Sequence, residues 1–256
     1  MESGQQDGQS FQVPPSGEVC PLCRGTGFEI HSSQAGSYAR PCACASRQRR
    51  ALRRRAARIP ERYEHCCLEH FNQLNDSLRR AVKCCRAIIG EFPGGEAQGL
   101  LLIGPSGVGK THLAVAVLRE LVEERGAVGL FAEFNDLLRR IQETFDRRSQ
   151  TPSWDVLRPA LDADVLLLDD LGATRMTPWM RDTLALIINE RYNHRRLILA
   201  TTNQEEAPAP GRESLADRIG ERLASRLAEM CMTARLEGDD YRRKAIRAGI
   251  DFRNGR

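Results

Sequence analysis

The stretch Gly99-Leu-Leu-Leu-Ile-Gly-Pro-Ser-Gly-Val-Gly-Lys-Thr-His112 decides the fold of this 256-residue chain. Its apolar first part, 99–103, predicts a buried strand, and the run from His112 to Val117 predicts a helix. Between them lies a Gly-x4-Gly-Lys-Thr sequence, whose glycines let the backbone turn sharply and present N–H groups to phosphate oxygens. A strand, a glycine loop and a helix in this order predict an α/β fold with a nucleotide-phosphate site.

Each residue of this loop is expected to contact ATP. Lys110 carries the positive charge that neutralises the β and γ phosphates, and the Thr111 hydroxyl offers one coordination position to Mg²⁺. The N-terminus of the following helix also favours anions. A glycine turn before an ordinary helix is the alternative, and the flanking strand and helix favour the nucleotide. The expected nucleotide-binding residues are Gly104, Pro105, Ser106, Gly107, Val108, Gly109, Lys110 and Thr111.

Polar side chains follow two later apolar runs. The run Val165–Leu168 ends in Asp169 and Asp170, and the run Leu197–Ala200 is followed by Asn203. Because the carboxyl ends of parallel strands meet at one edge of a sheet, these groups are expected beside the phosphate loop. Asp169 would hold Mg²⁺ through water, Asp170 would polarise the attacking water, and Asn203 would orient that water. A solvated acidic turn and an amide that caps a turn are the alternatives.

Short apolar runs alternate with helical patterns through the rest of the chain, which predicts a parallel sheet sandwiched by helices. Strands are expected at 100–103, 129–134, 165–168 and 197–200, with an edge strand at 232–236. Helices are expected at 74–92, after Lys110, and at 137–145, 179–192, 215–230 and 241–248.

Four of the nine cysteines form two close pairs, Cys20 with Cys23 and Cys42 with Cys44. Eighteen residues separate the pairs, which is close to the spacing of tetrahedral structural zinc sites. His31 is a possible substitute ligand, and a set of free thiols in a flexible tail is the alternative. The other five cysteines are expected to be buried for packing: Cys66, Cys67, Cys84, Cys85 and Cys231.

Composition sets the domain organisation. We expect a disordered tail at 1–17, a zinc-binding module at 18–46, a basic helix and helical linker at 47–95, and the ATPase domain at 96–256. The net charge is +4, and the acid-free stretch Arg47–Arg58 holds seven arginines. No apolar run is long enough to cross a membrane and the start is polar, so a cytoplasmic protein without a membrane partner is expected.

The basic stretch from Arg47 to Arg58 reads as a helix, with Leu52, Ala56 and Ile59 as its packing stripe. Seven arginines favour contacts with the phosphates of single-stranded DNA. A solvated helix face is the alternative.

Further motifs carry a family resemblance over roughly residues 18 to 250. They are Asp169-Asp-Leu-Gly172, Met176-Thr-Pro-Trp179, Ile187-Ile-Asn-Glu-Arg-Tyr192 and Thr201-Thr-Asn203. In these the chain resembles the AAA+ ATPases, and more narrowly the bacterial DnaC and DnaI helicase loaders and the related IstB transposition ATPases. DnaI-type loaders are similar to this chain in carrying an N-terminal cysteine module.

The resemblance also implies roles for late arginines. The sequence Gly220-Glu-Arg-Leu-Ala-Ser-Arg-Leu227 is similar to the motif that supplies an arginine finger to a neighbouring subunit, with Arg226 as the first choice and Arg222 as the second. Arg242 resembles the second sensor, which reaches the γ phosphate. A finger that acts in trans implies self-association through the ATP site. A helix face paired with nearby glutamates is the alternative for Arg226 and Arg222.

The family implies an ATPase, which forms ADP and phosphate, that loads a DnaB-like replicative DNA helicase in bacteria. The cysteine module and the stretch Arg47–Arg58 are then expected to contact that helicase, single-stranded DNA, or both. Many AAA+ proteins carry Asp-Glu where this chain has Asp169-Asp170. Aspartate reaches one methylene less far, so slow, switch-like hydrolysis is expected. An IstB-like transposition helper and a zinc-containing DNA-binding scaffold that holds ATP without turnover are the competing functions.

Overall fold

The computed structural model describes residues 19–33, 36–145, 152–205, 208 and 211–241 of the chain. The chain divides into two compact units between residues 51 and 52. The expected tail 1–17, the expected helix 241–248 beyond its first residue, and Arg242 lie outside the described residues. No helix in the described ranges is both long and apolar enough to cross a membrane.

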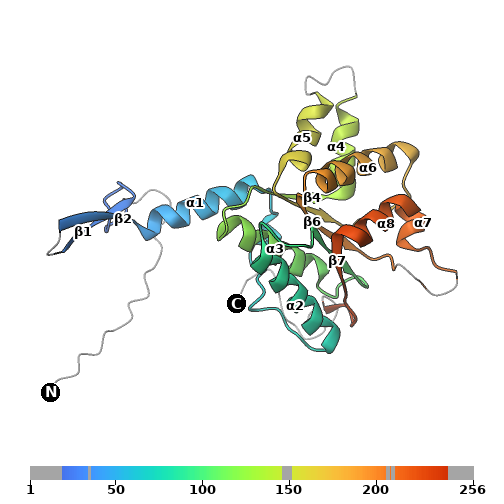
Figure 1. Cartoon of the computed structure of the whole chain (residues 1–256), viewed down its shortest axis with the longest axis horizontal. Helices are drawn as coiled ribbons and strands as arrows, with labels where there is room; N and C mark the ends of the chain where they lie inside the picture. Colours follow the sequence, from blue (N-terminus) through green and yellow to red (C-terminus); the bar gives the residue numbers. More distant parts are fainter. Residues whose placement is uncertain (1–18, 34–35, 146–151, 206–207, 209–210, 242–256) are drawn as a thin grey trace. The chain divides into compact units, whose positions relative to one another are not determined.

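A five-stranded parallel sheet organises the second unit, in the order β4-β5-β6-β3-β7 (Figure 1). Every residue of β3, β5 and β6 is buried, which is why these strands are continuous apolar runs rather than alternating ones. The strands are β3 Gly99–Ile103, β4 Gly129–Glu133, β5 Val165–Asp169, β6 Leu197–Thr202 and β7 Cys231–Arg235.

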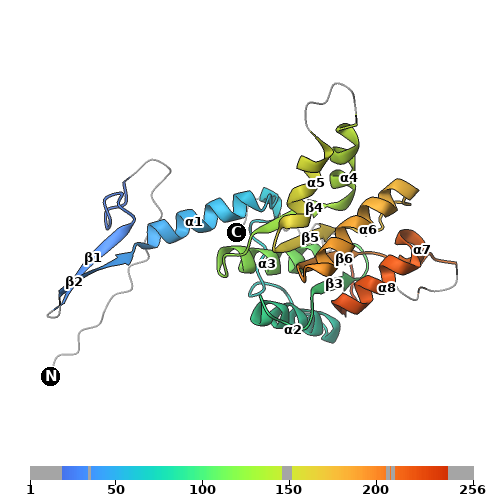
Figure 2. The same ribbon diagram turned by 45° about the horizontal axis from the view of Figure 1, so that its top comes forward.

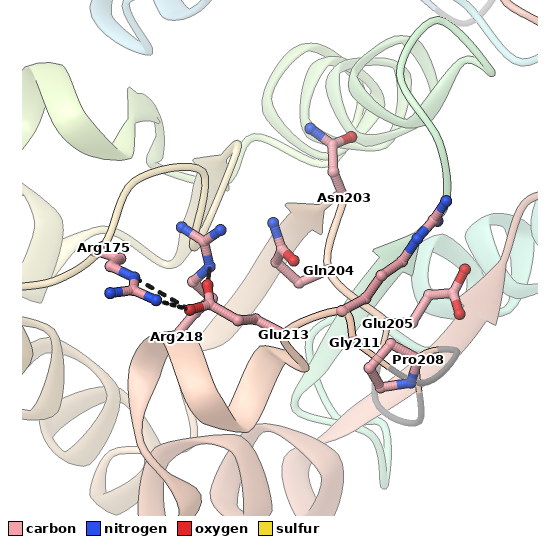
Figure 3. Close-up of a pocket in the computed structure, with 9 residues that line it drawn as sticks. Arg175, Asn203, Gln204, Glu205, Pro208, Gly211, Glu213 and Arg218 are labelled. Carbon is pink, nitrogen blue, oxygen red and sulfur yellow. Dashed lines mark hydrogen bonds and ion pairs between the residues drawn. The ribbon is translucent and has the colours of Figure 1, made fainter.

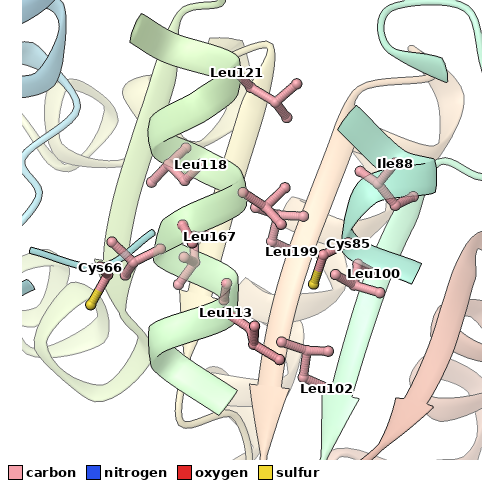
Figure 4. Packing of buried hydrophobic residues seen from close by; sticks show 14 of the residues in the cluster. Cys66, Cys85, Ile88, Leu100, Leu102, Leu113, Leu118, Leu121, Leu167 and Leu199 are labelled. Carbon is pink, nitrogen blue, oxygen red and sulfur yellow. The ribbon is translucent and has the colours of Figure 1, made fainter. Parts of the chain in front are cut away.

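Helices cover both faces of this sheet (Figures 1 and 2). On one face, α2 Asp76–Glu91 and α3 Lys110–Glu123 pack on alternate strand residues such as Leu100 and Leu102 (Figure 4). Leu101 and Ile103 point to the other face. That face is covered by α4 Phe134–Glu143, α5 Ser153–Asp162, α6 Pro178–Asn193, α7 Leu215–Ile219 and α8 Glu221–Met230. The expected sandwich of a parallel sheet between helices is confirmed.

Three elements differ from the sequence expectation. The single helix expected at 215–230 is two helices, because Gly220 adopts φ 97° and ends α7. Helix α5 has no counterpart among the expected helices. Helix α2, expected in a linker, packs against α3 in the same core as the sheet.

Arg191 of α6 is completely buried and joins three elements. Its guanidinium donates to the carbonyl oxygens of Ala160 at 3.0 Å, Ala163 at 2.9 Å and Asp164 at 3.2 Å, and also to that of Leu197. Desolvation lowers the pKa of Arg191 to about 9, so the group stays protonated at neutral pH. The carbonyl dipoles at the end of α5 and the start of β6 therefore stabilise a buried cation.

Replacing Arg191 by leucine is expected to lower the free energy of unfolding by about 3 to 5 kcal/mol, because four carbonyls lose a charged donor. Urea denaturation measures the change. Arg181→Leu, at an exposed position on the same helix, is the matched control and should stay within about 0.5 kcal/mol of the unaltered chain. Equal losses in the two variants would refute a role for the buried cation.

The N-terminal residues form an antiparallel hairpin of β1 Phe28–Ser33 and β2 Gly36–Pro41, followed by α1 Ala43–Ala56. The expected packing stripe is wrong. Leu52 is 60% exposed and Ala56 is exposed, while Ile59 is buried only after the helix has ended. Helix α1 ends at Ala56, before the expected end near Pro60. Arg58 adopts a left-handed φ of 55°, so residues 58 to 60 do not continue the helix.

Candidate functional site

The loop between β3 and α3 has the backbone of a phosphate cradle. Gly107 and Gly109 adopt φ of 78° and 109°, a region that side-chain-bearing residues rarely enter. A Cβ atom at Gly107 would lie 1.9 Å from Asp240 Oδ1, and one at Gly109 would lie 2.6 Å from the Phe71 ring. No side chain among the described residues caps the N-terminus of α3 at Gly109, so its first amides suit an anion.

Lys110 is the first residue of α3 and is only 7% exposed. Its Nζ donates to the carbonyl oxygens of Gly104 and Pro105, each at 2.8 Å, and to Asn203 Oδ1 at 2.6 Å. The ammonium group is thus held over its own loop, and it links that loop to the end of β6. A phosphate bound in the loop would lie within the reach of this charge.

The two expected magnesium residues are hydrogen-bonded to each other. Thr111 Oγ1 donates to Asp169 Oδ1 at 2.8 Å, and Thr201 Oγ1 donates to the same oxygen at 2.7 Å. Since the Thr111 proton points to Asp169, the Thr111 oxygen keeps its lone pairs for a metal ion. Burial raises the pKa of the Asp169 carboxyl above its ordinary value. An oxygen-only pair of this kind fits Mg²⁺.

Asp170 and Asn203 complete the network. Asn203 Nδ2 donates to Asp170 Oδ1 at 3.1 Å, while its carbonyl oxygen accepts from Lys110. Asp170 adopts a left-handed φ of 60°, and its N–H donates to Thr201 Oγ1 at 2.9 Å. One amide therefore connects the cation of the loop to the second carboxylate. Sequence reasoning assigns no role to Thr201, although a hydroxyl at the buried end of β6 is the available signal.

Arg226 and Arg222, the two candidates for an arginine finger, both lie on α8. Arg226 of α8 is half-buried, donates to Asn189 Oδ1, and places its guanidinium 4.7 Å from the centre of the Tyr192 ring. Its contacts are thus with α6 of its own chain. Arg222, one turn earlier, is exposed. The structure brings together the loop, Asp169, Asp170 and Asn203, whereas the contacts of Arg226 are with Asn189 and Tyr192.

A hollow of about 530 Å³ lies beside Asn203 at the end of β6 (Figure 3). Glu213 bridges two of its arginines, because its carboxylate contacts both Arg175 and Arg218. The phosphate loop does not line this hollow. Glu213 and Arg218 are five residues apart, whereas Arg175 lies 38 residues before Glu213, and no pattern in the chain predicts that Arg175 meets them.

The four N-terminal cysteines form one cluster, with all four sulfurs within 4.8 Å of one another. Cys20 and Cys42 sulfurs are 3.8 Å apart, and those of Cys23 and Cys44 are 3.3 Å apart. A tetrahedral zinc site with Zn–S bonds of about 2.3 Å places its sulfurs about 3.8 Å apart. Hydrogen bonding with Cys44 lowers the pKa of Cys23 to about 7, while hydrogen bonding to Cys23 raises the pKa of Cys44 and hydrogen bonding to Glu29 raises that of Cys42; the four sulfur atoms and their spacing are what favour a metal. The donor set therefore fits zinc.

His31 lies outside this cluster, since it stacks on Tyr38 in the hairpin with the ring centres 5.6 Å apart. The backbone supports the four-sulfur set instead. The Cys42 N–H donates to the Gly27 carbonyl at 2.8 Å, which ties the second cysteine pair to the turn after the first.

Changing all four of these cysteines to serine is expected to remove one zinc per chain, because serine hydroxyls do not replace thiolates as zinc ligands. Elemental analysis of the purified full chain measures the loss. Cys84→Ser, on α2 outside the cluster, is the control and should leave the zinc content unchanged. Unchanged zinc in the four-serine variant would contradict the assignment.

Together these features define a class of protein. A parallel sheet with a phosphate loop after β3, a carboxylate pair at the end of β5 and an amide after β6 belongs to an ATP-binding protein of the AAA+ P-loop class. The chain belongs to the IstB-like ATP binding protein family, whose model matches residues 42–248.

Comparison with known proteins confirms the resemblance to helicase loaders. The chain is 26% identical over 208 residues to the replicative helicase loader DnaC of Escherichia coli strain K12, which covers 79% of this chain and 80% of that protein. It is 26% identical over 213 residues to the uncharacterized protein YqaM of Bacillus subtilis strain 168, and the match spans 62% of YqaM and 76% of this chain. A crystal structure of the DnaC helicase loader matches with a TM-score of 0.62 at 35% identity, over 70% of this chain and 100% of that one.

Proposed function

We propose that this protein is an ATP-dependent loader of a DnaB-like replicative DNA helicase that binds ATP with Mg²⁺ and hydrolyses it slowly. The hydrogen bonds at the phosphate loop support the ATPase part of this proposal. Asn203 is hydrogen-bonded to both Lys110 and Asp170, and Thr111 is hydrogen-bonded to Asp169. The similarity to DnaC over four fifths of its length supports the loader part.

The side chains have distinct parts in the proposed hydrolysis. Lys110 stabilises charge on the β and γ phosphates, and Thr111 with Asp169 would hold the magnesium ion, which would supply further positive charge to those phosphates. Asp170 accepts a hydrogen bond from the attacking water, and Asn203 fixes the direction of that carboxylate through its amide. The shorter reach of aspartate relative to glutamate makes the water less well placed, which is the reason for slow turnover.

We place the second half of the site on a neighbouring copy of the chain. Arg226 is the proposed finger, and its packing on Asn189 and Tyr192 gives the side chain a defined direction. Arg226→Ala should then abolish hydrolysis while one chain still binds ATP. If Arg222→Ala has this effect and Arg226→Ala does not, the exposed arginine is the finger.

The N-terminal module and α1 are the proposed partner-binding end. The arginines of α1 include Arg47, Arg49 and Arg55, all exposed. Changing these three to alanine should make the slope of log affinity for single-stranded DNA against log salt shallower by about 2. Arg139 and Arg140, which are paired with Asp136 on α4, provide the control pair. An unchanged slope in the α1 variant would exclude its contact with DNA.

Size-exclusion chromatography of the full chain with the replicative helicase of its host tests the loader proposal. A complex whose amount depends on ATP is expected, and Lys110→Ala should remove the dependence on ATP. Transfer of the helicase onto closed circular single-stranded DNA is the functional readout. Absence of a complex with and without ATP would refute the proposal.

Membership of the IstB-like ATP binding protein family is compatible with one alternative, an IstB-like transposition helper. A complex with a transposase encoded beside this gene, in place of the helicase, would establish that function. The scaffold alternative predicts no phosphate release with ATP under any condition of DNA or partner.

A further inference from the structure

Nitrogen and sulfur side chains cluster beside α3, outside the ATP site and the four-cysteine module. His65, Cys66 and His112 bring three potential ligand atoms within 4.8 Å of one another. His65 and Cys66 are adjacent in the chain, and His112 is the residue after Thr111 of the phosphate loop. The sequence around Cys66 does not distinguish it from the cysteines expected to be buried for packing, because His112 is 46 residues further along the chain.

We propose that His65, Cys66 and His112 form a second metal site, which takes a divalent ion of the zinc class. One thiolate and two imidazoles are ligands that such ions prefer over Mg²⁺. Bond lengths of about 2.0 to 2.3 Å place tetrahedral ligands about 3.3 to 3.6 Å apart. His65 is exposed, so rotation of its side chain supplies the closing movement of roughly 1 Å that this geometry requires.

Surrounding contacts orient two of the three ligands. The His112 Nε2 lies 3.1 Å from the carbonyl oxygen of Cys67; as a donor to that oxygen it leaves the Nδ1 lone pair for a metal, as outer hydrogen bonds do in zinc sites. Arg119 Nη1 donates to the Cys66 carbonyl at 2.7 Å, which fixes the backbone of that residue on α3. Three protein ligands leave a fourth position for water or another donor.

The proposed ion would tie the segment 65–71 to the helix that begins in the phosphate loop. Phe71 ends this segment, and its ring lies 5.4 Å from the His112 ring and against Gly109. Metal binding at His65, Cys66 and His112 would therefore fix the side wall of the loop.

The test compares zinc content in the full chain after saturation with zinc and dialysis. In the variant that combines Cys20→Ser, Cys23→Ser, Cys42→Ser and Cys44→Ser, about one zinc per chain should remain at the second site, and His65→Ala in that background should remove it. His65 is exposed, so this change does not disturb the core. His194→Ala, another exposed histidine, is the control and should retain the ion.

Cobalt substitution gives a second readout. In the same four-serine background, Co²⁺ should produce a sulfur-to-metal charge-transfer band that disappears in Cys66→Ser. If His65→Ala changes neither the zinc content nor the cobalt spectrum of the four-serine variant, the proposal is wrong. The cluster would then be a packing contact between imidazole rings.

Discussion

Replacing Lys110 by alanine is expected to weaken ATP binding by about 100-fold to 1,000-fold, or roughly 3 to 4 kcal/mol. Lys110 is the buried cation of the loop, and it hydrogen-bonds to two loop carbonyls and to Asn203. Loss of a charged partner to a phosphate costs several kcal/mol because the phosphate charge is left uncompensated. Isothermal titration calorimetry with Mg-ATP measures the effect.

Lys83→Ala is the matched control, because Lys83 is an exposed lysine on α2. This variant should bind ATP as the unaltered chain does. A thermal melt of Lys110→Ala establishes that the variant is folded. If folded Lys110→Ala keeps the affinity of the unaltered chain, the loop does not use this lysine for ATP.

Asp170→Asn is expected to reduce single-turnover ATP hydrolysis by about 100-fold to 10,000-fold, the range for loss of a positioned general base. The affinity for ATP should change by less than about threefold, since the amide retains the size of the side chain and the loss is confined to the transition state. Asn203 should still donate a hydrogen bond to the oxygen of the new carboxamide. Phosphate release from a preformed ATP complex measures the rate.

Asp182→Asn serves as the control for Asp170→Asn because Asp182 is an exposed carboxylate on α6. It should leave hydrolysis unchanged. If Asp170→Asn and the unaltered chain hydrolyse ATP at equal rates, Asp170 has no role in hydrolysis. The function as a DNA-binding scaffold that holds ATP without turnover would then be favoured.

The fold could be predicted where burial leaves a simple pattern. Strands β3, β5 and β6 are covered on both faces, so they appear in the sequence as unbroken apolar runs. Their ends extend beyond those runs, because polar residues such as Asp169 and Thr202 continue the strand. Helix α5 is hard to predict since it is short, contains Pro159, and buries only Leu157, Ala160 and Leu161.

The candidate site also has parts that the sequence predicts and parts that it does not. The phosphate loop is contiguous, so its residue types and spacing are sufficient to predict it. Asp169 and Asn203 follow from the rule that strand ends share one edge of the sheet. The link from Thr201 to Asp169 and the meeting of His65 with His112 depend on tertiary packing, which a single sequence does not encode as a local pattern.

A crystal structure of the full chain with Mg²⁺ and a non-hydrolysable ATP analogue would show whether the loop after β3 binds the nucleotide. We expect the β and γ phosphates in the loop 104–111, with Lys110 Nζ on their oxygens and the ion bound to Thr111 Oγ1. Asp169 should contact the ion through water, and Asp170 should face the γ phosphate. A nucleotide bound elsewhere, or an ion without Thr111 as a ligand, would contradict this expectation.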